Sequence, residues 1–127
     1  NASAFPGLSD PAWLAFARRL YRERPDGALE PAYDPAIAEP MNASEAAAVP
    51  PALWELFDGL AAVPMLIVRG ALSDILSAAT VAEMTRRHPG AVAVEIADRG
   101  HAPMLTEPPA LAAIDDFLAA VADAGAR

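Results

Sequence analysis

The stretch PMLIVRG, residues 64–70, is a continuous apolar run that ends in an arginine and a glycine. A short run of aliphatic and β-branched residues without polar alternation is typical of a strand covered on both faces. A second run, AVAVEIA at residues 91–97, follows after an interval long enough for one helix. Two such strands joined through a helix predict parallel pairing with a right-handed crossover.

Helices are expected between and after these strands. Ser77 can accept a hydrogen bond at the start of a helix over residues 78–88, and a Pro-Gly pair follows that helix. After Glu107 a second helix begins, and we expect its apolar stripe to face the sheet. The stripe consists of Leu111, Ile114, Leu118 and Val121, with Phe117 beside it. The order strand, helix, strand, helix predicts an α/β fold.

The preceding residues are organised differently. An Asp-Pro pair at residues 10–11 favours a helix start, and apolar side chains at helical spacing extend that helix to about residue 23. Residues 25–27, Pro-Asp-Gly, would end it. Five prolines within residues 28–51 favour an irregular connection, interrupted by a short helix near residues 44–48.

A further short helix is expected to begin at Pro51, where apolar residues again have helical spacing. Its inward side chains would be Leu53, Trp54, Phe57 and Leu60. Trp54 and Phe57 are interpreted as core residues rather than substrate contacts, because both belong to this one stripe. We therefore divide the chain into residues 3–50 and residues 51–127.

Composition excludes several classes of function. The 127 residues carry a net charge of −8, and all nine basic residues are arginines. So few cations cannot form the broad basic face that binds phosphate backbones, and we expect no nucleic-acid partner. The sequence has no cysteine and only two histidines, so we expect no disulfide, metal site or cofactor. No uncharged stretch is long enough to span a bilayer, and we expect a cytoplasmic protein without a membrane partner.

Two polar side chains follow the two strands at their carboxyl ends. Asp74 follows the first strand, and His101 follows the second in the sequence ADRGHAP. Ligands of open parallel sheets bind beyond the carboxyl ends of the strands, and neighbouring strands lie about 4.8 Å apart. A carboxylate on one imidazole nitrogen fixes the tautomer, while the other nitrogen takes a proton from a nucleophile or water. The spacing therefore favours an acid–base pair of Asp74 and His101.

Structural roles compete with these functional interpretations. Asp74 can cap the turn that follows it, and His101 can be a satisfied turn histidine, but their strand-end positions favour function. Asp98 is a rival acid, and its place in the same turn as His101 is better explained by turn formation. His88 closes a helix and fits a surface residue that complements the helix dipole.

No nucleophile is evident in the chain. A nucleophilic serine on a strand-to-helix turn requires the pattern Gly-x-Ser-x-Gly, which the sequence lacks. The nearest match, GLSDP at residues 7–11, has no second glycine and no strand before it. The serines occupy cap, turn or terminal positions: Ser3, Ser9, Ser44, Ser73 and Ser77.

Taken together, these segments resemble the C-terminal portion of an α/β-hydrolase-fold enzyme. VPMLIVRGALSDIL, residues 63–76, is similar to the strand and loop that carry the family's acid. EIADRGHAP, residues 95–103, is similar to the strand and loop that carry its histidine. TEPPALAAIDDFL, residues 106–118, is similar to its last helix. The resemblance covers about residues 51–122.

The resemblance implies an incomplete α/β domain, namely the C-terminal βαβα part of a hydrolase sheet preceded by the end of a helical lid in residues 3–50. By position, Asp74 would be the triad acid and His101 the base. The family places its nucleophile, oxyanion-hole amides and first strands upstream, and this chain lacks them. Three aromatic side chains of the lid segment would line an acyl pocket: Trp13, Phe16 and Tyr21.

We therefore expect part of a hydrolase that acts on a small apolar ester, thioester or lactone, with the isolated chain inactive. An aspartate nucleophile upstream would instead indicate an epoxide hydrolase or a haloalkane dehalogenase. A third interpretation is a non-catalytic interaction or scaffold module. Because a two-stranded sheet is marginally stable and has open edges, we expect self-association or pairing with an N-terminal half.

Overall fold

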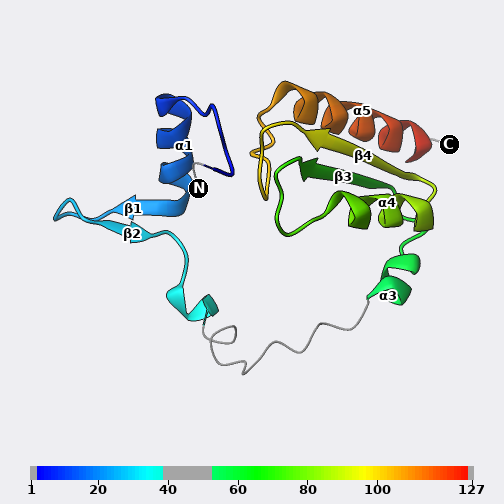
Figure 1. Ribbon diagram of the computed structural model, residues 1–127, viewed down its shortest axis with the longest axis horizontal. Coiled ribbons are helices and arrows are strands. Elements are labelled where there is room, and N and C mark those ends of the chain that lie inside the picture. Colours follow the sequence, from blue (N-terminus) through cyan, green and yellow to red (C-terminus); the bar gives the residue numbers. More distant parts are fainter. Residues whose placement is uncertain (1–2, 39–52, 126–127) are drawn as a thin grey trace. The chain divides into compact units, whose positions relative to one another are not determined.

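The computed structural model describes residues 3–38 and 53–125 (Figure 1). Its contacts divide the chain into two units, one formed by residues 1–7 with 52–127 and the other by residues 8–51. Each unit contains one two-stranded sheet. The helix expected near residues 44–48 and the helix start expected at Pro51 lie outside the described residues.

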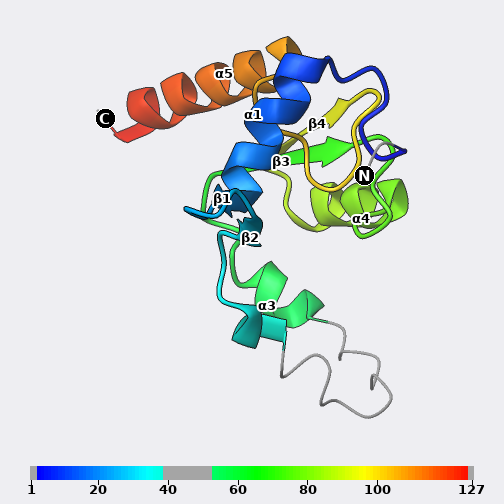
Figure 2. The same cartoon turned by 90° about the vertical axis from the view of Figure 1, so that its left-hand side faces the viewer.

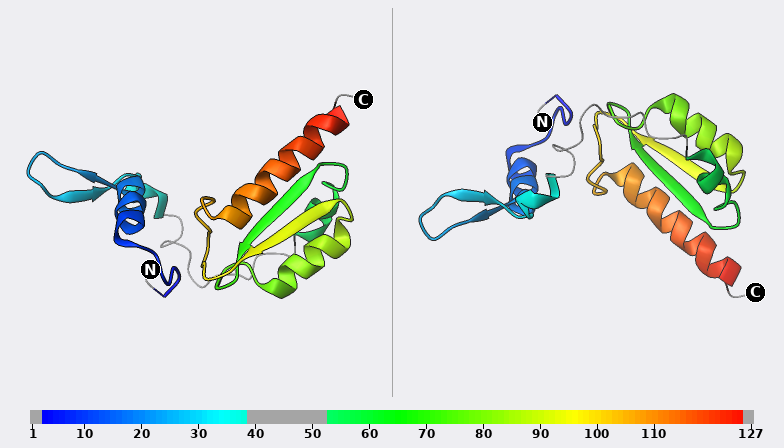
Figure 3. Two further views of the ribbon diagram at one scale, coloured as in Figure 1. Left: turned by 90° about the horizontal axis from the view of Figure 1, so that it is seen from above. Right: turned by 90° about the horizontal axis from the view of Figure 1, so that it is seen from below.

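The larger unit is built around a parallel strand pair. β3 pairs with β4 in a register that runs from Met65 opposite Ala91 to Gly70 opposite Ile96, which confirms the predicted parallel pairing. The helices α4 and α5 lie on opposite faces of this pair, as Figures 2 and 3 show. In chain order the elements are α3 (Trp54–Asp58), β3 (Met65–Gly70), α4 (Ala78–Arg87), β4 (Ala91–Ile96) and α5 (Pro108–Gly125).

Helix α4 begins and ends as its sequence predicts. The Ser77 hydroxyl accepts a hydrogen bond from the main-chain N–H of Thr80 at 3.0 Å, so Ser77 is the N-cap. At the other end, His88 occupies the C-cap and its N–H donates to Met84 O. The helix therefore runs from the carboxyl end of β3 back to the amino end of β4.

The core of this unit is small. Ile67 of β3, Ile96 of β4 and Ala110 of α5 are its buried apolar residues, together with Phe5 from the N-terminal segment. That segment is attached to the strand ends, because the N–H of Gly100 donates to Ala4 O. Residues 3–7 therefore belong structurally with the sheet that follows them some 60 residues later in the chain.

Helix α5 turns a different face to the sheet from the one expected. Ala110 is fully buried and Phe117 is half-buried, whereas Leu111 and Leu118 are 47% and 57% exposed. Ala110, Ile114 and Phe117 follow one another at helical spacing and form the covered stripe. The expectation that Leu111 and Leu118 face the sheet was wrong because two apolar stripes run along this alanine-rich helix, and periodicity alone does not choose between them.

Helix α3 is shorter than expected and is held by both apolar and charged contacts. Trp54 and Phe57 are half-buried, but Leu53 and Leu60 are exposed, so only part of the predicted inward face is covered. The guanidinium of Arg87 lies 4.9 Å from the centre of the Trp54 ring, at a distance suited to a cation–π contact.

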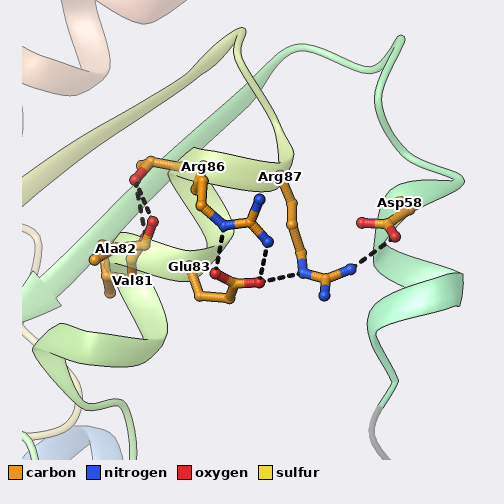
Figure 4. Close-up of polar contacts among 7 residues, drawn as sticks. Asp58, Val81, Ala82, Glu83, Arg86 and Arg87 are labelled. Atoms are coloured by element: carbon orange, nitrogen blue, oxygen red, sulfur yellow. Dashed lines mark hydrogen bonds and ion pairs between the residues drawn. The ribbon is translucent and has the colours of Figure 1, made fainter.

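A chain of ion pairs joins α3 to α4 (Figure 4). Asp58 pairs with Arg87 at 2.8 Å, and Arg87 in turn pairs with Glu83 at 2.5 Å. Arg86 completes the network by a contact of 2.6 Å with the same Glu83 oxygen. The two guanidinium groups bonded to Glu83 lower its pKa to about 2.

The smaller unit contains a hairpin where a helix end and a loop were expected. The first helix ends at Leu20 rather than near residue 23, and the chain turns at Gly27, whose φ is +80°. Pro-Asp-Gly is therefore a hairpin turn between two antiparallel strands. The elements are α1 (Asp10–Leu20), β1 (Tyr21–Glu23), β2 (Leu29–Pro31) and the 3₁₀ helix η1 (Pro35–Ala38). Both strands are too short to show the alternation that identifies a strand in a sequence.

Across residues 3–38 and 53–125, no helix has the length and apolar character needed to cross a membrane.

Candidate functional site at the carboxyl ends of the strands

The loops that follow β3 and β4 are hydrogen-bonded to each other. Both strands end on the same side of the sheet (Figure 1). Just beyond β3, the N–H of Ala71 donates to Ile96 O at 2.9 Å and the N–H of Leu72 donates to Arg99 O at 2.8 Å. The parallel ladder therefore continues into the loops, and the loop residues on the two sides share one rim.

Gly70 permits this close approach. A Cβ atom at Gly70 would lie 2.3 Å from both Arg99 O and Gly100 O, which is far inside van der Waals contact. Only glycine fits between the end of β3 and the loop after β4.

Asp74 and His101 both lie on this rim and both are exposed. The main chains of Leu72 and Arg99 are hydrogen-bonded to each other. Asp74 follows Leu72 by two residues, and His101 follows Arg99 by two residues. Among the residues that the structure describes, no hydrogen bond or ion pair joins the Asp74 carboxyl to the His101 imidazole. The structure thus brings the two loops into contact without joining these two side chains.

The loop that carries Asp74 is closed by Arg69. The Nε–H of Arg69 donates to Leu76 O at 2.7 Å, and its Nη2 donates to Ala71 O at 3.2 Å. The same guanidinium forms an ion pair with Glu95 on the neighbouring strand. Arg69 is 8% exposed, so its charge is buried and fully engaged with partners.

The loop that carries His101 is closed by Arg99 and Glu107. The Nε–H of Arg99 donates to Glu107 Oε1 at 2.8 Å. The carboxylate of Glu107 also accepts from the N–H groups of Met104, at 3.3 Å, and Thr106, at 3.1 Å. His101 therefore lies inside a loop whose two ends are joined by one ion pair.

The environment of Glu107 favours its charged form. Burial by itself raises the pKa of the Glu107 carboxyl, but hydrogen bonds from main-chain N–H groups and from Arg99 outweigh that effect. The pKa of Glu107 consequently lies below its usual value, and the ion pair with Arg99 persists through neutral pH.

The same loop holds two residues in the left-handed backbone region. Asp98 has φ of 55° and Leu105 has φ of 59°. An aspartate adopts this region readily, which fits the predicted role of Asp98 as a turn former. Leucine does so only where the surroundings enforce it, and Glu107 bonds the N–H groups on either side of Leu105.

The aromatic residues proposed to line an acyl pocket lie in the smaller unit. Trp13 and Phe16 of α1 pack edge to face, with ring centroids 5.8 Å apart, and Tyr21 of β1 is 44% exposed. Their role toward a substrate stays a prediction, because they belong to a unit separate from the one that carries Asp74.

His88 is not the surface residue that its position at a helix end predicts. It is 2% exposed, and its Nε2 lies 3.1 Å from Leu60 O and 3.0 Å from Val63 O. Because both neighbours are acceptors, Nε2 carries the hydrogen and donates it. Within the described part of the chain, His88 Nδ1 is a buried atom without a hydrogen-bond partner. His88 holds the chain that leads into β3, at the end of the sheet away from His101.

Sequence reasoning missed the residues that shape the two rim loops, namely Arg69, Arg99 and Glu107. One signal was present for Arg69, because a charged residue at the end of the apolar run MLIV needs a partner when it is buried. No local signal pairs Arg99 with Glu107 across eight residues of irregular loop. In the ranges 3–38 and 53–125, the side chains of His, Asp and Glu form no group of three suited to a metal ion.

Comparison with known proteins identifies the fold. The chain is similar to a solved α/β hydrolase from Novosphingobium aromaticivorans, with a TM-score of 0.81 and 40% identity over 92% of this chain. It is also 41% identical over 88 residues to the 3-hydroxybutyrate-oligomer hydrolase of Cupriavidus necator. No protein-family model matches the sequence.

These likenesses confirm the resemblance stated from the sequence: the chain has part of an α/β-hydrolase fold. It spans 41% of the solved hydrolase and 30% of the curated one. Both similar proteins are hydrolases by name.

Proposed function

We propose that this chain supplies the acid and the base of a catalytic triad in a hydrolase, with Asp74 as the acid and His101 as the base. The observation that carries the proposal is the pair of hydrogen bonds that tie the two strand-end loops together. They support the proposal because Asp74 and His101 belong to these loops at the carboxyl ends of parallel strands, which is where ligands of such sheets bind. The similarity to two hydrolases supports it.

In this proposal His101 removes the proton of a hydroxyl nucleophile as that oxygen attacks an acyl carbon, and later returns the proton to the leaving group. Asp74 orients the imidazole and stabilises its charged form. Polypeptide outside these 127 residues provides the nucleophile. The exposure of both side chains fits a site that is completed by such a group.

We propose an ester of small acyl units as the substrate. The relative from Cupriavidus necator is named for hydrolysis of 3-hydroxybutyrate oligomers, whose units are joined by ester bonds. An ester falls within the class of small apolar ester, thioester or lactone that the sequence indicates. A triad that acts through an acyl intermediate suits this class of bond.

We also propose that the larger unit pairs with further polypeptide, from a second copy or from a longer chain. In the described residues β3 and β4 form a sheet of two strands, which is marginal by itself. Leu56 and Ile75 of this unit are 72% and 74% exposed, and further polypeptide would cover these apolar side chains.

The experiment compares three variants of the full-length protein that contains this chain, with p-nitrophenyl butyrate as substrate. His101→Ala is expected to lower kcat by about 10⁴-fold, and Asp74→Asn by about 10²- to 10⁴-fold. Asp98→Asn is the matched control, because Asp98 is an acid on the same rim and asparagine tolerates its positive φ. This control is expected to keep activity within about twofold.

Labelling by a fluorophosphonate probe reports the nucleophile. Labelling of the full-length protein, and none of the 127-residue chain, is the expected result. Wild-type turnover in His101→Ala would refute the proposal. Turnover without labelling would favour an aspartate nucleophile, as in epoxide hydrolases. Light scattering of the 127-residue chain is expected to show multimers, and a monodisperse, well-folded monomer would contradict the pairing proposal, because such a monomer would need no partner.

A further inference from the structure

The guanidinium group of one arginine bonds each of the two rim loops: Arg69 the Asp74 loop and Arg99 the His101 loop. We propose that Arg69 and Arg99 are positioning residues that hold the Asp74 loop and the His101 loop in the geometry needed for catalysis. The inference rests on the proposed function for its catalytic consequence. Its structural part, that the two guanidinium groups fix the loop backbones, stands on the hydrogen bonds alone.

Arg69 bonds both ends of the loop that carries Asp74, here called the acid loop. Its guanidinium bonds the first carbonyl of the loop, Ala71 O, and a carbonyl beyond the acid, Leu76 O. Because a guanidinium is planar and rigid, two bonds from one group fix the distance between the two carbonyls. The Asp74 backbone lies between these two carbonyls. Within the loop, the Ser73 hydroxyl accepts a hydrogen bond from the N–H of Leu76 at 3.0 Å.

Arg99 and Glu107 form the corresponding clamp across the histidine loop. The Glu107 side chain is 9% exposed and the Arg99 side chain 19%, so water competes little for this pair. Arg99 Nη1 also donates to Asp98 O at 2.7 Å, which ties the guanidinium to the turn directly after β4. Glu107 bonds the N–H groups on both sides of Leu105 and so maintains its positive φ.

The two clamps are connected to each other. The N–H of Leu72, within the segment that Arg69 spans, donates to the main-chain oxygen of Arg99. Displacement of one loop therefore changes the position of the other. A buried ion pair contributes little net stability compared with apolar residues of the same size, but it fixes the partners' geometry. Paired charges at both loops, beside the proposed acid and base, fit a positioning role better than a stabilising one.

The test uses Arg69→Gln, Arg99→Gln and Glu107→Gln in the full-length protein. We expect kcat to fall about 10- to 100-fold with KM within about twofold, because a displaced base affects the chemical step more than binding. Arg99→Lys keeps one donor for Glu107 and is expected to recover part of the loss. Arg86→Gln is the matched control, since Arg86 also pairs with a glutamate but lies on α4 away from the rim.

Amide hydrogen exchange gives a readout that does not depend on activity. Exchange is expected to rise at least about tenfold in residues 71–76 of the Arg69 variant and in residues 99–107 of the Arg99 and Glu107 variants, with β3 and β4 unchanged. If Arg99→Gln does not fold, the isosteric Glu107→Gln decides the question for the histidine loop, and if Arg69→Gln does not fold, the isosteric Glu95→Gln takes its place for the acid loop. Wild-type kcat and exchange in all three glutamine variants would overturn the inference.

The outcomes separate this inference from the proposed function. If His101→Ala keeps full turnover while the glutamine variants still loosen the loops, the proposed function fails and the clamps remain as structural devices. If His101→Ala is inactive and the glutamine variants leave kcat and exchange unchanged, the triad stands and the positioning role fails.

Discussion

The two ends of the β3–β4 sheet differ in the side chains that bond their main-chain carbonyls. At the carboxyl ends, the guanidinium groups of Arg69 and Arg99 donate to main-chain carbonyls of the loops that carry Asp74 and His101, and both of these side chains are exposed. At the amino ends, one buried group, the imidazole of His88, bonds two carbonyls beside an apolar pocket of about 330 Å³. Val63, Val92 and Phe117 contribute to that pocket.

The difference shows why one histidine is a candidate for catalysis and the other is not. His88 is buried, and its donor nitrogen is committed to Leu60 O and Val63 O. His101 is exposed in a loop whose shape is fixed by other residues. A proton-transfer group needs an accessible nitrogen and a rigid support, and only the carboxyl end provides both.

The largest expected effect on the free energy of unfolding comes from a glycine substitution at the carboxyl end, compared with one at the amino end. Gly70→Ala places a Cβ 2.3 Å from the carbonyl oxygens of Arg99 and Gly100 and should lower the free energy of unfolding by about 3 kcal/mol. Gly90→Ala at the amino end meets His88 Cε1 at 3.6 Å, an ordinary contact, and should cost less than about 1 kcal/mol. Urea denaturation measures both, and equal losses would contradict the close approach at the rim.

A smaller effect is expected from the buried histidine. His88→Leu removes the donor for Leu60 O and Val63 O and should lower the free energy of unfolding by about 1–3 kcal/mol. Turnover of the full-length protein should remain at wild-type levels under conditions where the variant is folded. His101→Ala should show the reverse, a stability change below about 0.5 kcal/mol and loss of turnover. A loss of turnover in the folded His88→Leu variant would contradict the assignment of a structural role to His88.

The smallest effect concerns the ion-pair network at α3 and α4. Arg86 and Arg87 lower the pKa of Glu83 from 4.5 to about 2, so its contribution to stability is present above pH 4.5 and is lost as the pH falls toward 2. Glu83→Gln should reduce the dependence of Tm on pH between 4.5 and 2. The change should be slight, because exposed ion pairs contribute little. An unchanged pH dependence would show that the network does not stabilise the folded state.

The strands and the larger helices follow from the sequence because their signals are local. The apolar run at residues 65–70 and the cap at Ser77 act through neighbours in the chain, and both appear where predicted. The hairpin of Tyr21–Glu23 with Leu29–Pro31 was missed, since strands of three residues carry no measurable periodicity. The covered face of α5 was predicted wrongly because two apolar stripes run along this helix, and periodicity alone does not choose between them.

The sequence by itself determined that Asp74 and His101 follow two parallel strands, since strand order and strand ends are set by local patterning and by the handedness of the crossover. Tertiary structure alone decided that the loops bond each other, that Arg69 and Arg99 hold them, and that His88 is buried. These features depend on contacts between residues that are distant in the chain, such as Arg69 with Glu95 and His88 with Leu60. These contacts form only after the helices and strands have packed, so local sequence patterns do not predict them.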